Sequence, residues 1–406
     1  MMQQSISKYT DTTFTILLGL AFTSLFLGQA VMHLVGLAFI IALIIFRPRL
    51  PWIAPFWWMI AFITWEFLSD YLGPYSGNGM EGMGIGYHFL FLFVPLVLPV
   101  INYGLLIIYA GVGAIASAIL MWLQAIIGLD LNATPWRINW DGGLMFERTP
   151  GFNKRAWVIQ FIHSLVGLVM LPHIKWNKPI HIIAFTGFIT GVVLPQVRGV
   201  IAALCVGFGT QLMFVKQSLK KADYIKRAFV ILIFAALLIG TLAYLRPGFL
   251  NSMAGGNNRD AIFTVSIEMY KQNPHTGIGG GKHFQDLYIQ TWDNLSENPI
   301  LKGKSGSGLH TQIGHTHSDY IMLLVHNGWP ALLLWLAFVI HSLKFVWQFG
   351  THSERIIFTS LVLMHHIAGI AETYLDYSNT AYAIFLCYGL AMHGPIKRYQ
   401  EQHNTA

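Results

Sequence analysis

The sequence predicts an all-α integral membrane protein with about twelve membrane-spanning helices. Hydrophobic residues make up 54% of the 406 residues, charged residues make up only 11%, and the mean hydropathy is +0.54. A soluble chain of this length would expose far more charge. Apolar runs of about 15 to 25 residues, the length that crosses a hydrocarbon core of about 30 Å, recur along the chain. These observations exclude an ordinary soluble globule.

The expected spans fall into two groups on either side of one long polar segment. Residues 1–245 contain the first nine spans, residues 246–319 form a long loop, and residues 320–406 contain the last three spans and a tail. The expected spans are 14–27, 31–46, 52–69, 87–100, 105–127, 156–171, 180–196, 199–215, 228–245, 320–345, 356–373 and 381–393.

The distribution of Lys and Arg between the spans predicts their orientation. With an even number of spans, most of the basic clusters fall on one side, which is then cytoplasmic together with both termini. The clusters are Arg47 with Arg49, Lys175 with Lys178, the five basic residues of 216–227, and Lys397 with Arg398. They do not gather on one face, so no nucleic-acid partner is expected. The long loop then lies outside, and we expect it to carry short helices and the functional site.

One outer segment, 128–155, is basic against this rule, because it contains Arg137, Arg148, Lys154 and Arg155. Three explanations stay open. The orientation is wrong there, the outer face binds anions, or Lys154 and Arg155 simply extend to the membrane interface.

The passage NNRDAIFTVSIEMYKQNPHTGIGGG (257–281) predicts an amphipathic helix in the long loop. Asn257 or Asn258 can cap a helix that starts at Arg259 and stops at Pro274. Four apolar residues recur at helical spacing and are expected on one flank: Ile262, Phe263, Ile267 and Tyr270.

Arg259 lies in the first turn of this helix, where the backbone dipole disfavours another cation unless an anion compensates. Either Asp260 supplies that anion, or Arg259 and free amide groups hold a phosphate. The turn PHTGIGGG (274–281) can bring backbone close to a ligand or bend the chain sharply. It lacks the strand and the Gly-Lys-Ser/Thr of a nucleotide loop, so no nucleotide site is expected.

Two further residues are candidates for chemistry. Arg198 lies in a tight turn between two apolar runs, where it either extends to the interface or binds a phosphate through its planar fork. His317 precedes the tenth span, whose start Ser318 or Asp319 can cap, and the helix dipole there favours the neutral imidazole that accepts a proton. Asp319 would favour the charged ring. His317 is one of 17 histidines, so an ordinary surface role is the alternative.

The order of these passages resembles the O-antigen ligase family. The matching segments are VRGV (197–200), the passage 257–281 described above, and HSDYIMLLVHNG (317–328). Relatives in the broader superfamily include O-antigen polymerases and protein O-oligosaccharyltransferases. The resemblance implies a GT-C-like glycosyltransferase of the bacterial inner membrane with its active site at the periplasmic face.

By that resemblance, the enzyme transfers polysaccharide from undecaprenyl diphosphate to a sugar hydroxyl of lipid A core, with inversion at the anomeric carbon. Arg198 and Arg259 would hold the diphosphate, and His317 would be the catalytic base. No cofactor or metal is expected, since the outer carboxylates are scattered rather than clustered. The chain departs from the family at Ser318, where Asn is common, and at Pro330, where a second Gly is common.

Three alternatives remain open after this comparison. A polymerase or a protein O-oligosaccharyltransferase would use the same donor. A secondary transporter would also have twelve spans, but the sequence shows no repeated halves. The role of His326 is unassigned, and Glu66 and Glu372, near the outer ends of their spans, are expected to make only interfacial hydrogen bonds.

Overall fold

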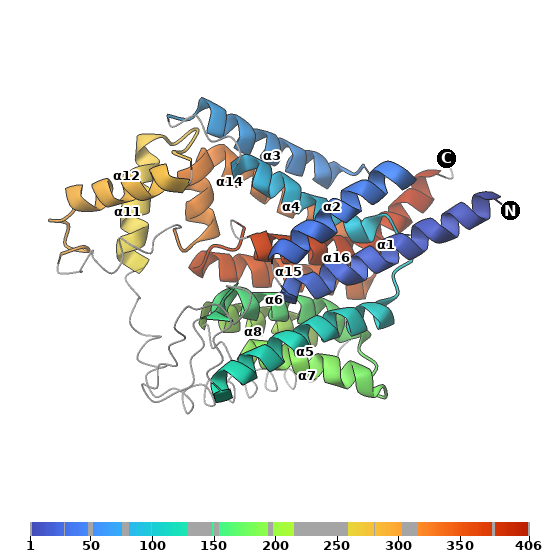
Figure 1. Cartoon of the computed structure of the whole chain (residues 1–406). Helices are drawn as coiled ribbons and strands as arrows, with labels where there is room; N and C mark the ends of the chain where they lie inside the picture. Colours follow the sequence, from blue (N-terminus) through green and yellow to red (C-terminus); the bar gives the residue numbers. More distant parts are fainter. Residues whose placement is uncertain are drawn as a thin grey trace.

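The computed structural model describes residues 2–27, 29–47, 52–74, 81–98, 100–127, 148–149, 154–193, 198–214, 259–279, 281–302, 316–375 and 378–404. Over these residues the chain is a bundle of helices (Figure 1). The described strands are two residues each, β1 (Arg148–Thr149) and β2 (Lys154–Arg155), which pair in antiparallel register. The all-α prediction is confirmed for the described part of the chain.

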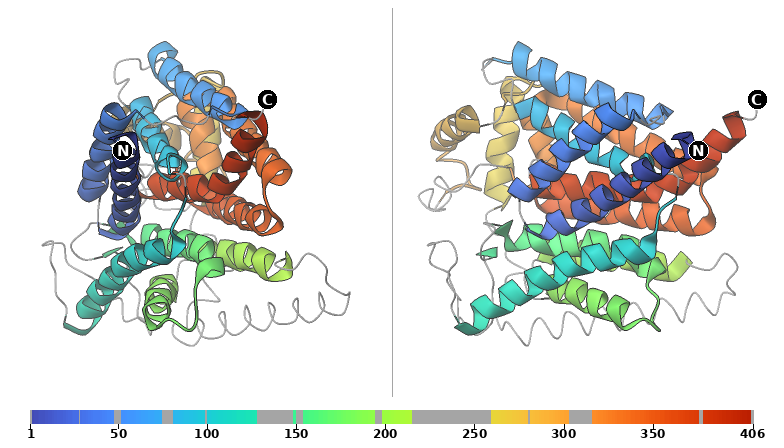
Figure 2. Two further views of the ribbon diagram at one scale, coloured as in Figure 1. Left: turned by 90° about the vertical axis from the view of Figure 1, so that its right-hand side faces the viewer. Right: turned by 45° about the vertical axis from the view of Figure 1, so that its right-hand side comes forward.

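The long helices run side by side, and helices α5 to α8 form one side of the bundle (Figures 1 and 2). Two shorter helices, α11 (Arg259–Gln272) and α12 (Gly281–Asn294), lie at one end, and both chain termini lie at the other. The bundle helices are α1 (Met2–Leu27), α2 (Gln29–Phe46), α3 (Ala54–Leu72), α4 (Glu81–Leu96), α5 (Tyr103–Ile127), α6 (Ala156–Met170), α7 (Pro179–Val193), α8 (Arg198–Phe214), α14 (Asp319–Phe349), α15 (His352–Ala371) and α16 (Ser378–Asn404). A short 3-10 helix, η1 (Leu171–His173), follows α6.

Eleven of the twelve expected spans coincide with bundle helices, and the remaining one, 228–245, lies outside the described residues. The largest boundary errors concern three helices. The first helix begins at Met2 rather than at residue 14, because the polar segment before its apolar run is already helical. The fourth helix covers 81–96 rather than 87–100, because the Gly-rich segment before its apolar run is already helical. The last helix covers 378–404 rather than 381–393, since it continues beyond its apolar run into a polar tail. Hydropathy marks the apolar part of a helix and not its ends.

The surface of the bundle is apolar in a way that suits a lipid surround. On α2, for example, the side chains of Leu34, Ile44 and Ile45 are each 66% exposed. Among the described helices, α14 and α15 are long and apolar enough to cross a membrane, by length and composition alone. Several others are apolar over 10–17 residues. The architecture is therefore compatible with a membrane protein. The number of spans and their orientation stay predictions.

Helices α11 and α12 form a small unit with an apolar core of its own, to which Val325 of α14 contributes. The predicted start of α11 at Arg259 is confirmed, and the helix ends just before Pro274. The predicted flank was partly wrong, because Phe263, Ile267 and Tyr270 are only partly buried. The buried residues of α11 are Ala261, Ile262, Val265, Ser266 and Met269. The last four follow the i, i+3, i+4, i+7 spacing from Ile262, which is the stripe that faces a core.

Helix α14 is broken at Gly328, which has φ 78° and ψ 176°. Pro330 has no N–H to donate to the carbonyl of His326, one turn earlier, so this carbonyl accepts the N–H of Gly279 instead, at 3.0 Å. The N–H of Ile278 donates to Val325 O at 2.8 Å, and the N–H of Trp329 donates to Pro274 O at 3.0 Å. The turn 274–279 is therefore joined to the break in α14 by three backbone hydrogen bonds.

Glycine is needed on both sides of this junction. A Cβ on Gly277 would lie 2.3 Å from the carbonyl oxygen of His326, and one on Gly328 would lie 2.1 Å from that of His275. Both glycines also have positive φ. The close backbone approach expected for the turn 274–281 is thus made to α14 rather than to a ligand, and it fixes the α11–α12 unit to the bundle.

Candidate active site

His317 lies immediately before α14, at the end of the bundle that carries α11 and α12. Its backbone is in the left-handed region, with φ 54°. Its ring nitrogen Nδ1 lies 2.9 Å from Oε1 of Glu372, the residue that ends α15. The side chain of His317 is 27% exposed and that of Glu372 is 8% exposed. The imidazole therefore reaches the surface while its partner is buried.

Arg259 begins α11 and contacts the same carboxylate from another direction. Its guanidinium nitrogen Nη2 lies 3.9 Å from Oε2 of Glu372, and its side chain is 33% exposed. Two of the three predicted site residues, which are far apart in the sequence, are thus brought together on one carboxylate. The sequence offered Asp260 as a compensating anion for Arg259, and the structure adds Glu372 as an ion-pair partner.

Arg198 is the first residue of α8, and its side chain lies outside the described part of the structure. Its neighbour Gly199 packs against the end of α15, since a Cβ on Gly199 would lie 3.2 Å from the Cβ of Ala371. Ala371 directly precedes Glu372. The start of α8 therefore lies close to the turn that carries Glu372. That the guanidinium of Arg198 takes part in the site stays a prediction.

Glu372 is the residue that sequence reasoning missed. Its expected role was only an interfacial hydrogen bond, whereas it contacts both His317 and Arg259. Helix α15 ends there, with the N–H of Glu372 donating to Ala368 O at 3.1 Å, and the N–H of Thr373 donates to its Oε1 at 3.2 Å. The signal in the sequence was a single acidic residue at the end of an apolar run, close to the predicted outer surface.

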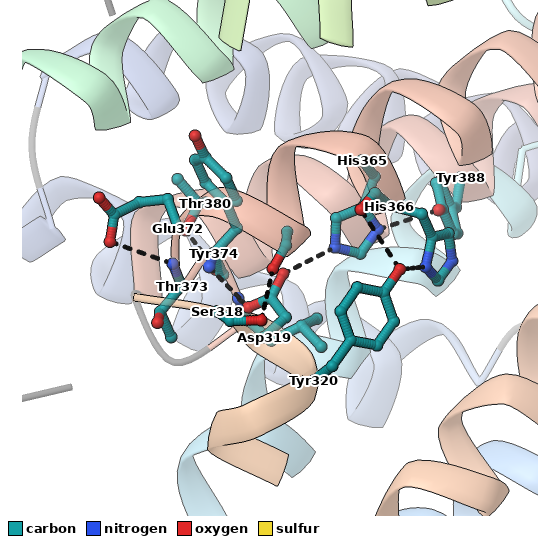
Figure 3. A network of polar contacts seen from close by, with 12 residues as sticks. Ser318, Asp319, Tyr320, His365, His366, Glu372, Thr373, Tyr374, Thr380 and Tyr388 are labelled. Carbon is teal, nitrogen blue, oxygen red and sulfur yellow. Dashed lines mark hydrogen bonds and ion pairs between the residues drawn. The ribbon is translucent and has the colours of Figure 1, made fainter. Parts of the chain in front are cut away.

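The carboxyl group of Asp319 contacts residues other than His317. Its Oδ1 accepts the backbone N–H groups of Tyr374 at 2.7 Å and Leu375 at 2.8 Å, while Oδ2 lies 3.4 Å from Nε2 of His365 (Figure 3). Ser318 occupies the N-cap position of α14, but its hydroxyl donates to Gly369 O at 3.2 Å instead of capping the helix. The carboxylate beside His317 is therefore that of Glu372, because Asp319 is engaged elsewhere.

The turn that carries Glu372 is otherwise tightly packed. The ring of Tyr374 is fully buried and stacks on Phe161, with 3.9 Å between ring centroids. Burial raises the pKa of the Tyr374 hydroxyl well above its ordinary value, and the negative charge of Glu372 adds to this effect. The hydroxyl therefore stays protonated at neutral pH and does not compete with His317 as a base.

Other polar residues singled out in the sequence lie outside this cluster. The ring of His326 packs edge-on against Phe284 of α12, at 5.1 Å between centroids. Lys154 and Arg155 form strand β2, paired with Thr149 and Arg148. Within the residues that the structure describes, no three His, Cys, Asp or Glu side chains form a set of metal ligands.

The geometry assigns complementary roles to the two ring nitrogens of His317. An ionised carboxylate can only accept a hydrogen bond, so Nδ1 carries the proton that points at Glu372. In the neutral ring the lone pair is then on Nε2, and the imidazolium that forms on protonation is stabilised by Glu372. The cluster can therefore accept a proton and, through Arg259, attract an anion.

A family comparison agrees with this geometry. Residues 182–336 match the family model described as O-Antigen ligase. The matched region contains Arg198, Arg259 and His317, as well as the turn 274–279 and the break in α14 to which it is joined. No curated protein matches the chain at a significant level. O-antigen ligases are glycosyltransferase-like membrane enzymes, and the match supports a relation of residues 182–336 of this chain to the O-antigen ligase family.

Proposed function

We propose that the protein is a lipopolysaccharide O-antigen ligase. It transfers a polysaccharide from undecaprenyl diphosphate to a sugar hydroxyl of lipid A core. The observation that carries the proposal is the meeting of His317 and Arg259 at Glu372. His317 and Arg259 lie within the residues that match the O-antigen ligase family model, and Glu372 lies beyond them. The site combines a base with a cation, which are the two groups that such a transfer needs.

In this proposal Arg259 and Arg198 bind the diphosphate of the donor. A guanidinium group matches phosphate oxygens through two parallel hydrogen bonds. As the bond between the anomeric carbon and the diphosphate breaks, negative charge grows on the leaving oxygens, and the two cations offset it. Arg259 is partly exposed, and its guanidinium lies 3.9 Å from Glu372 Oε2, which is a long ion pair. A bound diphosphate can therefore contact Arg259 with little rearrangement.

His317 serves as the general base through Nε2. The oxygen of the acceptor hydroxyl forms a bond to the anomeric carbon, its proton passes to Nε2, and the electron pair of the breaking bond leaves with the diphosphate. The attack is in line with the leaving group, so the configuration of the anomeric carbon inverts. Glu372 keeps the Nδ1 proton in place and stabilises the imidazolium, and such base catalysis contributes roughly 100- to 10,000-fold.

The proposed orientation places this site at the periplasmic face of the bacterial inner membrane. Both termini lie at the opposite end of the bundle from α11 and α12, and an even number of spans would put them in the cytoplasm. The side of the bundle that faces lipid would admit the polyprenyl chain, while the acceptor sugar would approach from the water-facing end.

The proposal is tested by reconstituting the purified protein in lipid vesicles with lipid-linked O-antigen and rough lipopolysaccharide, in the presence of a chelator. A ladder of glycan on lipopolysaccharide is the expected product. Longer lipid-linked chains would instead identify a polymerase. In a separate reaction with a protein acceptor, glycosylation of that protein would identify an oligosaccharyltransferase. Movement of lipid-linked glycan without any new glycosidic bond would contradict the assignment as a transferase.

A further inference from the structure

The start of α14 is hydrogen-bonded to the end of α15 and to the turn that follows it, on both sides of Glu372. Before Glu372, the hydroxyl of Ser318 donates to Gly369 O at 3.2 Å. After it, Asp319 accepts the N–H groups of Tyr374 and Leu375 at 2.7 and 2.8 Å (Figure 3). We name these three hydrogen bonds the clasp. His317 is the residue immediately before the clasp, so the clasp determines where its backbone lies relative to Glu372.

The clasp leaves Asp319 almost no room to move. The side chain of Asp319 is 4% exposed, and a Cβ on Gly369 would lie 2.6 Å from its Oδ2. Behind it, His365 approaches Oδ2 through Nε2 at 3.4 Å and lies 3.1 Å from the hydroxyl of Tyr388 through Nδ1. Thr380 of α16 donates to Tyr374 O and so holds the same turn from its other side. Fixed backbone donors therefore meet Oδ1 of Asp319, whereas Oδ2 is held by close packing against Gly369 and His365.

His317 itself needs such support. Its φ of 54° lies in the left-handed region, which residues other than glycine adopt at a cost and keep only when their surroundings hold them there. The clasp begins at the next residue, and its bonds lie within a buried, polar network (Figure 3).

We propose that Asp319 is a positioning residue for glycan transfer. By accepting the N–H groups of Tyr374 and Leu375 it sets the contact between His317 Nδ1 and Glu372 Oε1. The effect on the reaction rate rests on the proposed function, whereas the effect on the His317–Glu372 contact does not. What counts in this role is an oxygen acceptor at Oδ1 rather than a negative charge.

Three substitutions distinguish positioning of His317 against Glu372 from a general contribution to helix packing. Asp319→Asn keeps the oxygen acceptor and the shape, and Asp319→Ala removes both. Tyr320→Phe is the matched control, because it removes the adjacent, partly buried contact, 2.6 Å between the Tyr320 hydroxyl and His366 Nδ1. That contact does not touch the turn that carries Glu372.

The first measurement needs no substrate. Full-length protein with ¹⁵N-labelled histidine is placed in lipid nanodiscs, and the His317 ring signals are assigned by their loss in His317→Gln. Asp319→Asn and Tyr320→Phe should keep the wild-type Nδ1 signal. Asp319→Ala should move it to the position found in Glu372→Gln. An unchanged signal in Asp319→Ala would overturn the inference, as would a shift of the same size in Tyr320→Phe.

The second measurement uses the transfer assay described above. We expect Asp319→Ala to lower kcat by about tenfold or more, while the KM for the lipid-linked donor stays within about threefold of wild type. This pattern is expected because the contact between His317 and Glu372 matters in the transition state and not in donor binding. Asp319→Asn should stay within about threefold of wild type in both constants. A loss in Asp319→Asn equal to that in Asp319→Ala would show that the acceptor oxygen is not the decisive feature.

A second pair of variants covers the case in which Asp319→Ala fails to fold. Gly369→Ala pushes a methyl group against Asp319 Oδ2, whereas Gly167→Ala adds one in a bundle helix where the nearest atom is 3.8 Å away. The His317 signal should move in Gly369→Ala and not in Gly167→Ala, and the opposite pattern would overturn the inference. Wild-type protein that transfers no glycan would count against the proposed function alone, since the ring signals are measured without it.

Discussion

The junction between the turn 274–279 and the break in α14 allows one prediction to be worked in detail. In Gly277→Ala the new Cβ would lie 2.3 Å from both C and O of His326, at a residue with φ 69°. The left-handed conformation costs about 1–2 kcal/mol for a residue with a side chain. The clash also separates backbones joined by three hydrogen bonds, each of which contributes about 0.5–1.5 kcal/mol. Together these terms predict a loss of about 3–6 kcal/mol.

The matched control is Gly279→Ala two residues later. Gly279 has φ 74°, but no atom lies within 4 Å of its added Cβ, so only the conformational cost of about 1–2 kcal/mol applies. The pair therefore separates the clash from the backbone strain. Both glycines lie in the same turn, which makes their local surroundings comparable.

Amide hydrogen exchange in nanodiscs measures this difference directly, because it reports local opening free energies. In Gly277→Ala the amide of Ile278 should exchange at least about 100-fold faster than in wild type, and in Gly279→Ala about 5- to 30-fold faster. Equal protection in Gly277→Ala and wild type would refute the reasoning. So would an acceleration in Gly279→Ala as large as that in Gly277→Ala.

The remaining predictions concern the site. Glu372→Gln should lower the transfer rate about 10- to 150-fold, since a hydrogen bond to a charged group contributes about 1.5–3 kcal/mol; wild-type turnover would remove the carboxylate from the mechanism. His317→Ala should lower the transfer rate about 100- to 10,000-fold, to a residual rate that long incubations with labelled donor can measure, and Arg259→Ala should abolish transfer. Membrane insertion of both variants, followed by fluorescence-detected gel filtration, should stay normal. Loss of insertion would instead assign these residues to folding. Lys271→Ala breaks an exposed ion pair with Glu268, 2.6 Å long, and should change neither rate nor insertion by more than about twofold. Transfer should be unchanged by a chelator, and a requirement for a divalent cation would contradict the proposed roles of the two arginines.

Several features of the fold followed from the sequence because they depend on local chemistry. Apolar runs marked eleven of the bundle helices, and the Asn–Asn pair and Pro274 marked the limits of α11. The break in α14 did not follow, although Gly328 and Pro330 are both visible in the sequence. Their effect depends on a distant turn whose N–H groups bind the carbonyls of His326, which Pro330 cannot satisfy, and of Val325, which Trp329 leaves free by donating to Pro274. That pairing is a tertiary contact, and hydropathy carries no information about it.

The same division holds for the site. His317 and Arg259 became candidates because the order of their passages resembles the O-antigen ligase family, and the structure places both on one carboxylate. Glu372 did not become a candidate, because a single acid at the end of an apolar run is also what an interfacial residue looks like. The role of Asp319 was predicted from its closeness to His317 in sequence, whereas its carboxylate points at residues 374–375, more than fifty positions away.

The central claim is that His317 and Glu372 act as one unit in transfer. A double-mutant cycle tests it most directly, with initial rates measured for wild type, His317→Ala, Glu372→Gln and the double variant. If Glu372 acts through the imidazole, adding Glu372→Gln to His317→Ala should lower the rate little further. Two losses that multiply in the double variant would show that the residues act independently and would contradict the account.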